Sequence, residues 1–448
     1  MRRYPIAALL VVFGVVSLAV NAVEAVARPP SVVSVLDFGA VGDGVADDTE
    51  AIQKALNGST AEVVFPAGTY RVTKTLFLGL PRPTTSFSYR RHFRGEGVEQ
   101  SFLAWDGEAG GTLFHARSML SCKFSSLSFI GHPGAKSGKV TTGRAGILFQ
   151  CEFTGGGNML NCFDSCRFNN ADVGIKMGIK EGEGTNSDVL FSNIMASQVG
   201  TFFWAANNQA VDFTFNFLFI VDAGTVFRFQ RGGNLLVNSV QVTDADTVLR
   251  IEGGGRCAAT YVLNNARLEG GTAGLRKRLQ LLSAPDIAWE QALVRFIGFN
   301  DAQWQWYANA GESRRRPLCD IGPGVNVAFD SSAFNGPVAT VTGREGKPAS
   351  VVIRESTFGY LTPAEAITAN PFGYFKTENC FTDNMAPYPD VVKWPALPRQ
   401  MIAGDADFET PLPGPVKTSV EAGDNHQKRQ AAWVQSLEPE QEPGAASR

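Results

Sequence analysis

Polar and apolar positions recur along the chain from about residue 120 in one repeated unit. Each unit is a polar residue followed by apolar residues two and four positions later. The clearest copies are Asp164–Cys166–Phe168, Asn216–Leu218–Ile220, Asn238–Val240–Val242 and Asn264–Ala266–Leu268, with a weaker one at Ser192–Ile194–Ala196. Successive polar residues lie 22 to 28 residues apart. Alternate side chains of a strand point to opposite faces, and a repeat of this length is typical of a solenoid. The pattern therefore predicts stacked parallel strands around an apolar interior.

Three of the repeated polar positions are asparagines, Asn216, Asn238 and Asn264. Equivalent positions on adjacent coils of a solenoid lie about 4.8 Å apart. Each amide could then bond the next amide and the turn backbone. We therefore expect these side chains to form a structural ladder at a bend of the coil.

The segment Val35–Leu56, VLDFGAVGDGVADDTEAIQKAL, predicts a short strand, a tight loop and a short helix. Glycines at positions 39, 42 and 44 supply backbone freedom for the loop. Asp47 and Asp48 stand where a helix N-cap is needed, and Thr49–Leu56 places its apolar residues on one side. We expect this helix to cover the open apolar end of the first coil.

A strand and turn, VVFPAGTYRV at Val63–Val72, follow the helix. This order resembles the opening segment of the pectate-lyase-like superfamily, which holds polygalacturonases, rhamnogalacturonases and phage tailspike depolymerases. The resemblance implies an all-β, right-handed parallel β-helix with a short N-terminal capping helix. Polygalacturonase-like enzymes also carry an NTD motif, an adjacent Asp pair and a GHG motif in their central coils. The one adjacent pair here is Asp47-Asp48, in the capping segment, so the resemblance transfers no catalytic residue.

The two ends of the chain differ from the repeat region. Arginines at positions 2 and 3 precede an apolar run over Ile6–Val20, and a small-residue site ends at Ala27. Residues 1–27 are therefore predicted to be a signal peptide, with an uncleaved membrane anchor as the alternative. We expect a β-helix domain over 28–400 with an insertion near 300–325, then a proline-rich, disordered tail over 401–448. The mature chain should be secreted or periplasmic, with no membrane span.

Composition narrows the chemistry further. The formal net charge of −3 gives no basic face for nucleic acid. The seven cysteines lack metal-ligand spacing and are odd in number, so most are expected to be buried small hydrophobes, with one or two disulfides as the alternative. The four histidines, at positions 92, 115, 132 and 426, fall outside the central coils. This spacing argues against an imidazole-based mechanism.

Aligning the coils on their inner residues places cations in one column. Lys176, Arg228, Arg250 and Arg276 each stand eight residues after an inner position, and the intervening coil carries Phe203-Trp204 there. One interpretation is a surface where these cations pair with acids. The other is a cleft for an anionic chain such as a uronate polysaccharide, with Trp204 or Phe203 stacking on a sugar ring.

The same alignment of the coils also brings three aspartates close together. Asp222 and Asp244 should lie on adjacent coils with carboxyl groups roughly 5 Å apart, and Asp246 follows two residues later. Such a pair could act as glycosidase acids or hold Ca²⁺ that bridges to a uronate. In a lyase, Arg228 or Arg250 could serve as the base or neutralise the uronate. Alternatively, both aspartates are turn residues chosen for backbone bonding.

These features favour a secreted carbohydrate-active enzyme that cleaves an acidic polysaccharide by hydrolysis or β-elimination. The expected catalytic residues are Asp222, Asp244, Asp246, Arg228 and Arg250, and the expected substrate-binding residues are Lys176, Trp204 and Arg276. Ca²⁺, on Asp222 and Asp244, is the one cofactor considered. The alternative is a non-catalytic glycan-binding or structural surface protein, because the fold alone does not decide function.

Overall fold

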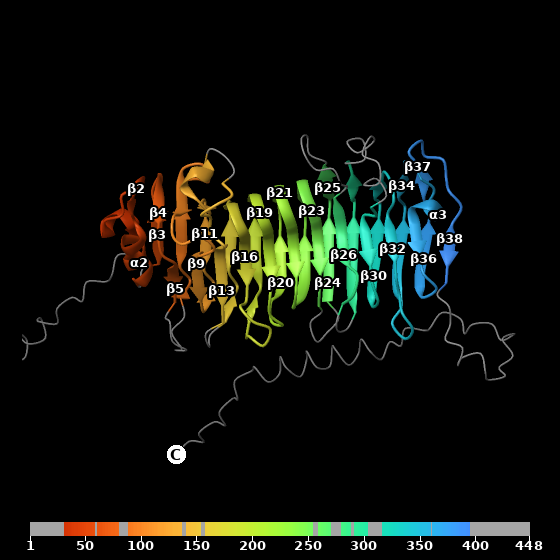
Figure 1. Ribbon diagram of the computed structural model, residues 1–448, viewed down its shortest axis with the longest axis horizontal. Coiled ribbons are helices and arrows are strands. Elements are labelled where there is room, and N and C mark those ends of the chain that lie inside the picture. The colour runs from red at the N-terminus through yellow and green to blue at the C-terminus, as the bar shows by residue number, and fades with distance from the viewer. Residues whose placement is uncertain are drawn as a thin grey trace, which may run out of the picture. The chain divides into compact units, whose positions relative to one another are not determined.

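The computed structural model describes residues 31–394, apart from 59–60, 80–87, 137–139, 154–156, 254–258, 270–278, 288–290, 303–315 and 360. These residues belong to one compact unit, Met1–Ala396. In this unit short strands follow one another in coils that stack side by side (Figure 1). The predicted architecture, a right-handed parallel β-helix, is confirmed. None of the helices in the described part of the chain is long and apolar enough to cross a membrane.

One long sheet, called sheet A here, takes one strand from each coil. All its described pairings are parallel except the last, between β36 and β38. Its strands are β1 (Val32–Ser34), β3 (Glu62–Phe65), β7 (His92–Gly95), β11 (Lys123–Ser125), β15 (Cys162–Asp164), β18 (Val189–Ser192), β20 (Val211–Phe215), β22 (Gly233–Val237), β24 (Ala259–Asn264), β27 (Ala292–Ile297), β30 (Val325–Asp330), β33 (Ala349–Arg354), β36 (Gly373–Glu378) and β38 (Val391–Lys393).

The second long sheet, sheet B, consists of two parallel ladders. The long strands β16, β19, β21 and β23 take part in both ladders and so join them. Its strands are β2 (Asp43–Asp47), β4 (Gly68–Val72), β5 (Leu76–Leu78), β8 (Ser101–Trp105), β9 (Thr112–Arg117), β12 (Ser128–Ile130), β13 (Ile147–Glu152), β16 (Arg167–Met177), β19 (Ile194–Ala205), β21 (Leu218–Phe229), β23 (Val240–Ile251), β25 (Ala266–Glu269), β26 (Gln280–Ala284), β28 (Asn300–Asp301), β29 (Cys319–Ile321), β31 (Ala333–Phe334), β32 (Ala339–Val341), β34 (Thr357–Phe358), β35 (Ile367–Ala369) and β37 (Phe381–Thr382).

The remaining elements are short. A small parallel sheet holds β6 (Ser88–Tyr89), β10 (Met119–Leu120), β14 (Asn158–Met159) and β17 (Asn186–Ser187). The helices of the described residues are the 3₁₀ turns η1 (Val35–Phe38) and η2 (Pro133–Lys136) and the α-helices α2 (Thr49–Asn57) and α3 (Pro363–Ala366).

The interior is built from columns of apolar side chains, one residue per coil. The expected inner positions Phe168, Ile220, Val242 and Leu268 are all buried and stand in register. Behind sheet A, five phenylalanine rings stack face to face. Their centroids are 4.7, 5.1, 5.1 and 4.3 Å apart from Phe93 through Phe124, Phe163 and Phe191 to Phe215. Offset-stacked rings at this spacing attract one another beyond the burial of their surface.

The N-terminal cap agrees with the expected helix but differs in two details. Ile52, Ala55 and Leu56 of α2 are buried, as predicted for a capping face. The strand expected before Gly39 is wrong in part, because Val35–Phe38 forms the 3₁₀ turn η1 instead. Asp48 occupies the N-cap position but makes no capping bond. Its carboxylate instead accepts the backbone N–H groups of Val41 and Gly42, at 2.6 and 3.2 Å, and so fixes the glycine loop.

The asparagine ladder is confirmed. The Asn238 amide nitrogen donates to the Asn216 amide oxygen at 2.8 Å, and Asn264 donates to Asn238 at 3.3 Å. The described cysteines at 122, 151, 162, 166, 319 and 380 are free thiols, mostly buried, and Cys257 lies outside the described residues. Predictions for the signal peptide, the core of the 300–325 insertion and the C-terminal tail also fall outside the described residues.

Candidate functional site

Register brings the predicted acids onto neighbouring coils of sheet B. Asp222 of β21 and Asp244 of β23 occupy equivalent positions, and Asn170 and Gln198 precede them on earlier coils. All four have left-handed backbone conformations, with φ between 56° and 59°. Asparagine and aspartate tolerate this region better than most residues. The left-handed backbone at Asp222 and Asp244 therefore supports the interpretation of turn residues. What their side chains can do chemically depends on the groups that surround them.

Both aspartates line an open cavity of about 460 Å³ together with Asp246. The other lining residues are Thr141, Arg144, Gln198, Val199, Gly200, Ala223 and Gly224. A Cβ on Gly200 would stand 2.6 Å from the Asp172 carbonyl oxygen, and one on Gly224 2.4 Å from the Gly200 carbonyl oxygen. Side chains are excluded at both positions by the close approach of neighbouring coils. At these two positions the cavity is lined by backbone, beside three aspartates.

Two arginines from distant parts of the sequence reach this cavity. Arg144 forms an ion pair with Asp172. Arg316 contacts Asp246 at 2.9 Å and donates to the Gln280 side-chain oxygen, also at 2.9 Å. Sequence reasoning missed both, because Arg144 lies in a turn and Arg316 is 70 residues from its partner. The Asp246 carboxylate is therefore held by the Arg316 guanidinium, and the three aspartates are not simply a row of repelling acids.

The Ca²⁺ prediction was tested on the donor set. Ca²⁺ takes six to eight oxygen ligands. Across the described residues, no three His, Cys, Asp or Glu side chains converge in a way that could hold a metal ion. Asp222 and Asp244 therefore do not fit a Ca²⁺ site built by protein side chains alone.

The predicted cation column exists on the same sheet, farther along the strands. Lys176, Trp204, Arg228 and Arg250 stand in register on successive coils. The alternative that Phe203 faces outward is wrong, because its side chain is fully buried in the core. The Lys176 ammonium lies 4.5 Å from the centre of the Trp204 ring and the Arg228 guanidinium 4.3 Å. Since the two cations come from the coils on either side, a sugar could stack on this ring only after displacing one of them.

A single carboxylate pairs with both arginines of the column. Glu252 accepts from Arg228 at 2.9 and 3.2 Å and contacts Arg250 at 2.7 Å. The interpretation of surface ion pairs is therefore supported for these arginines, although two guanidinium groups that share one carboxylate keep a net positive charge. Neither arginine is among the residues that line the acid cavity. Arg276 lies outside the described residues.

Two basic side chains of this column, those of Lys176 and His115, have lowered pKa values. Burial, with a smaller contribution from the charge of Arg228, lowers the pKa of the Lys176 amine, while Glu183 opposes the shift. Two strands earlier in the same column stands His115. Its imidazole lies 2.9 Å from the Glu152 carboxylate, and burial lowers the pKa of His115. His115 thus lies on a coil before the central ones, as expected, but shares the outward column of Lys176.

Comparison with known proteins agrees with this architecture. Residues 32–250 match a family model described as rhamnogalacturonase A/epimerase, pectate lyase-like. Mannuronan C5-epimerase AlgE2 of Azotobacter vinelandii is 34% identical over 120 residues, which cover 24% of this chain and 12% of that protein. Plasmin and fibronectin-binding protein A of Streptococcus pneumoniae is 48% identical over 50 residues, covering 10% and 7%. The matches thus span 12% or less of these relatives.

Two solved structures have the same fold. The gp42 tailspike of Acinetobacter phage vb_AbaP_AS12 has a TM-score of 0.54 at 12% identity, covering 86% of this chain and 67% of that one. DFA-IIIase from Arthrobacter chlorophenolicus A6, without its lid, has a TM-score of 0.51 at 11% identity, covering 81% and 97%. The resemblance first seen in Val35–Leu56 is thereby supported over residues 32–250. The described chain has the fold of a right-handed parallel β-helix, and this part of it is similar to the pectate-lyase-like family.

Proposed function

We propose that this chain is a carbohydrate-active enzyme that hydrolyses an acidic polysaccharide in the cavity lined by Asp222, Asp244 and Asp246. The observation that carries the proposal is that three aspartates from two adjacent coils line one open cavity. Paired carboxyl groups are the usual machinery of glycoside hydrolysis. The described lining contains no lysine, histidine or tyrosine that could act as the base of a β-elimination.

In this proposal Asp222 and Asp244 share the chemistry. One carboxyl group, acting as general acid, gives its proton to the glycosidic oxygen as the C1–O bond breaks. The other attacks C1, and water then releases the sugar. Adjacent coils are about 4.8 Å apart, which is closer to the ~5–5.5 Å carboxyl separation of retaining enzymes than to that of inverting ones. The expected stereochemical outcome is retention.

The cations at the cavity account for an acidic substrate. Arg144 lines the cavity and shares its charge with Asp172, whose carboxylate is largely exposed to solvent. A uronate carboxylate could take the place of Asp172 on this guanidinium, since arginine binds carboxylates in a planar, two-pronged geometry. Arg316 instead positions Asp246.

A second candidate reaction, β-elimination, is favoured by the lowered pKa of Lys176. In this reaction the Lys176 amine would take the C5 proton of a uronate. The electron pair would form the C4–C5 double bond as the C4–O bond breaks. Similarity to an epimerase, which acts at C5, is consistent with this alternative. Its chemistry would sit at the cation column rather than at the acid cavity.

The test is turnover of a panel of polyuronates and neutral glycans, with reducing ends and near-ultraviolet absorbance followed together. Hydrolysis yields reducing ends without absorbance, and Asp222→Asn or Asp244→Asn should each lower the rate by at least ~100-fold. Glu355→Gln is the matched control, because Glu355 is exposed and also left-handed, at φ 51°, but lies on a remote coil.

Other outcomes redirect the assignment. Absorbance that depends on Lys176 and survives Asp222→Asn would replace hydrolysis by β-elimination. Undiminished hydrolysis in both aspartate variants would overturn the site. Binding without turnover on every substrate would favour a non-catalytic glycan-binding protein.

A further inference from the structure

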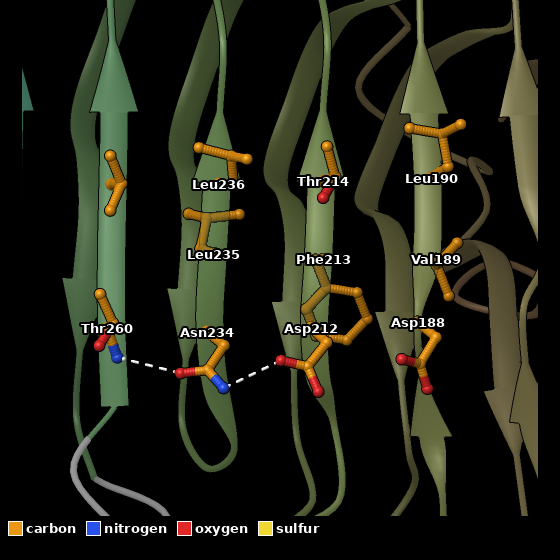
Figure 2. Close-up of a pocket in the computed structure, with 11 residues that line it drawn as sticks. Asp188, Val189, Leu190, Asp212, Phe213, Thr214, Asn234, Leu235, Leu236 and Thr260 are labelled. Carbon is orange, nitrogen blue, oxygen red and sulfur yellow. Dashed lines mark hydrogen bonds between the residues drawn. The ribbon is translucent and has the colours of Figure 1, made fainter. Parts of the chain in front are cut away.

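A second cavity, of about 560 Å³, opens on the outer face of sheet A. It spans the four neighbouring strands β18, β20, β22 and β24 (Figure 2). None of its lining residues belongs to the acid cavity or to the cation column, both of which lie on sheet B. The residues that face outward here have no part in the proposed hydrolysis.

Register divides the outer face of these strands into columns. The first holds Asp188, Asp212, Asn234 and Thr260, one polar residue per coil, in the row that Figure 2 shows. The second column, two residues farther along each strand, is mostly aliphatic: Leu190, Thr214, Leu236 and Val262. Leu190 is 38% exposed. The third column is the amide ladder of Asn216, Asn238 and Asn264. The cavity is therefore a groove with one polar edge and a mostly aliphatic floor, and the amide ladder lies beyond its lining.

The first column is held in place by its own hydrogen bonds. Asn234 donates to the Asp212 carboxylate at 2.9 Å and accepts the Thr260 backbone N–H at 3.1 Å (Figure 2). Asp188 accepts from the Ser187 hydroxyl. Each carboxylate keeps one oxygen that accepts no hydrogen bond from the described residues. Two fixed acceptors thus face the groove on adjacent coils, about 4.8 Å apart.

Charge limits what this groove can bind. Its lining contains Asp188 and Asp212 and no lysine, arginine or histidine. A uronate would meet uncompensated repulsion there. Sugar hydroxyl groups both donate and accept hydrogen bonds, so they suit an edge that carries carboxylates and an amide. The apolar C–H face of a pyranose ring suits an aliphatic floor.

We propose that this groove on sheet A binds a linear, uncharged oligosaccharide along the axis of the coils. Hydroxyl groups on one side of the chain donate to Asp188 and Asp212, and sugar rings rest on Leu190, Leu236 and Val262. The site is separate from the acid cavity and does not rest on the proposed hydrolysis. It gives the protein a glycan site that prefers an uncharged chain to an acidic one.

The experiment is calorimetric titration of the Asp222→Asn chain, which keeps any substrate intact. Neutral hexasaccharides built from glucose, galactose or mannose are compared with oligogalacturonate and with oligomeric glucosamine. At least one neutral hexasaccharide should bind, and Asp188→Asn with Asp212→Asn should weaken it at least tenfold. Asparagine is tolerated in the left-handed conformation of both positions, at φ 54° and 62°, so the fold should survive.

A second pair of variants tests the floor. Val262→Arg should abolish binding by filling the groove, and the fold should accept it because Arg295 stands at the same outer position one coil later. Val352→Arg, in the same column beyond the groove, is the control and should bind as the parent does.

Three results would overturn the proposal. These are the absence of binding to every neutral hexasaccharide, equal binding by Val262→Arg, and tighter, salt-sensitive binding of oligomeric glucosamine. The last would make the groove a site for a cationic chain. If Asp222→Asn lost turnover but still bound the neutral hexasaccharide, the acid cavity and the groove on sheet A would be two separate sites.

Discussion

Replacing Phe191 by alanine removes the fourth ring in the stack of five phenylalanines behind sheet A. The ring is fully buried. It stacks on Phe163 at 5.1 Å and Phe215 at 4.3 Å and meets Phe203 edge-on at 5.8 Å. All these neighbours are fixed by their own coils, so the gap has little freedom to close.

The expected loss follows from these contacts. Phenylalanine-to-alanine changes in cores cost about 3–5 kcal/mol, and each well-placed aromatic pair adds roughly 0.5–1.5 kcal/mol beyond burial. With three ring partners and poor collapse, we expect Phe191→Ala to lower the free energy of unfolding by about 5 kcal/mol, the upper end of the range. Phe191→Leu, which keeps most of the volume, should cost about 1.5 kcal/mol.

Urea unfolding followed by circular dichroism measures the difference, provided the slope m stays the same among the variants. Phe217→Ala is the matched control, since that side chain is 45% exposed, and it should change stability by less than about 0.5 kcal/mol. Equal midpoints for Phe191→Ala and Phe217→Ala would refute the claim that the ring stack stabilises the coils.

Three other changes test separate features. Gly224→Ala should lower the stability of the fold by about 1–3 kcal/mol in thermal unfolding, because the added Cβ would meet a carbonyl oxygen at 2.4 Å. Gly182→Ala is the control and should not lower it, because the space around Gly182 is open. Glu252→Gln frees both arginines that it pairs, so polyuronate affinity at low salt should rise; unchanged affinity would contradict this. Burial raises the pKa of Asp320, so the folded state disfavours its carboxylate. Asp320→Asn should therefore be more stable than the parent at neutral pH, and the gap should close as the pH falls to 3.8; a gap independent of pH would argue against it.

Much of the fold could be read from sequence because the relevant signals are local. Alternation placed Phe168 and Ile220 inside, and coil length placed Asp222 beside Asp244 and Lys176 beside Trp204. The cavity itself could not be predicted. One of its acids, Asp246, is held by Arg316, and that contact spans 70 residues, which no local repeat indicates.

The position of His115 in the cation column was missed for a related reason. The coils that precede the central ones are longer, as Arg117 and Glu152 are ion-paired although 35 residues apart. The short period of the central coils therefore does not extend back to His115. Likewise, the outer groove on sheet A carries no motif, because its floor is formed by single aliphatic residues contributed by separate coils.

The unbroken register of β16, β19, β21 and β23 makes the coil a modular building block. Removing the 22 residues 217–238 would rejoin the chain at an equivalent point, with every interior column still continuous. Such proteins can lengthen or shorten by whole turns without redesigning their interior. The surface can then change its chemistry one coil at a time, because each coil contributes a single side chain to every outward column.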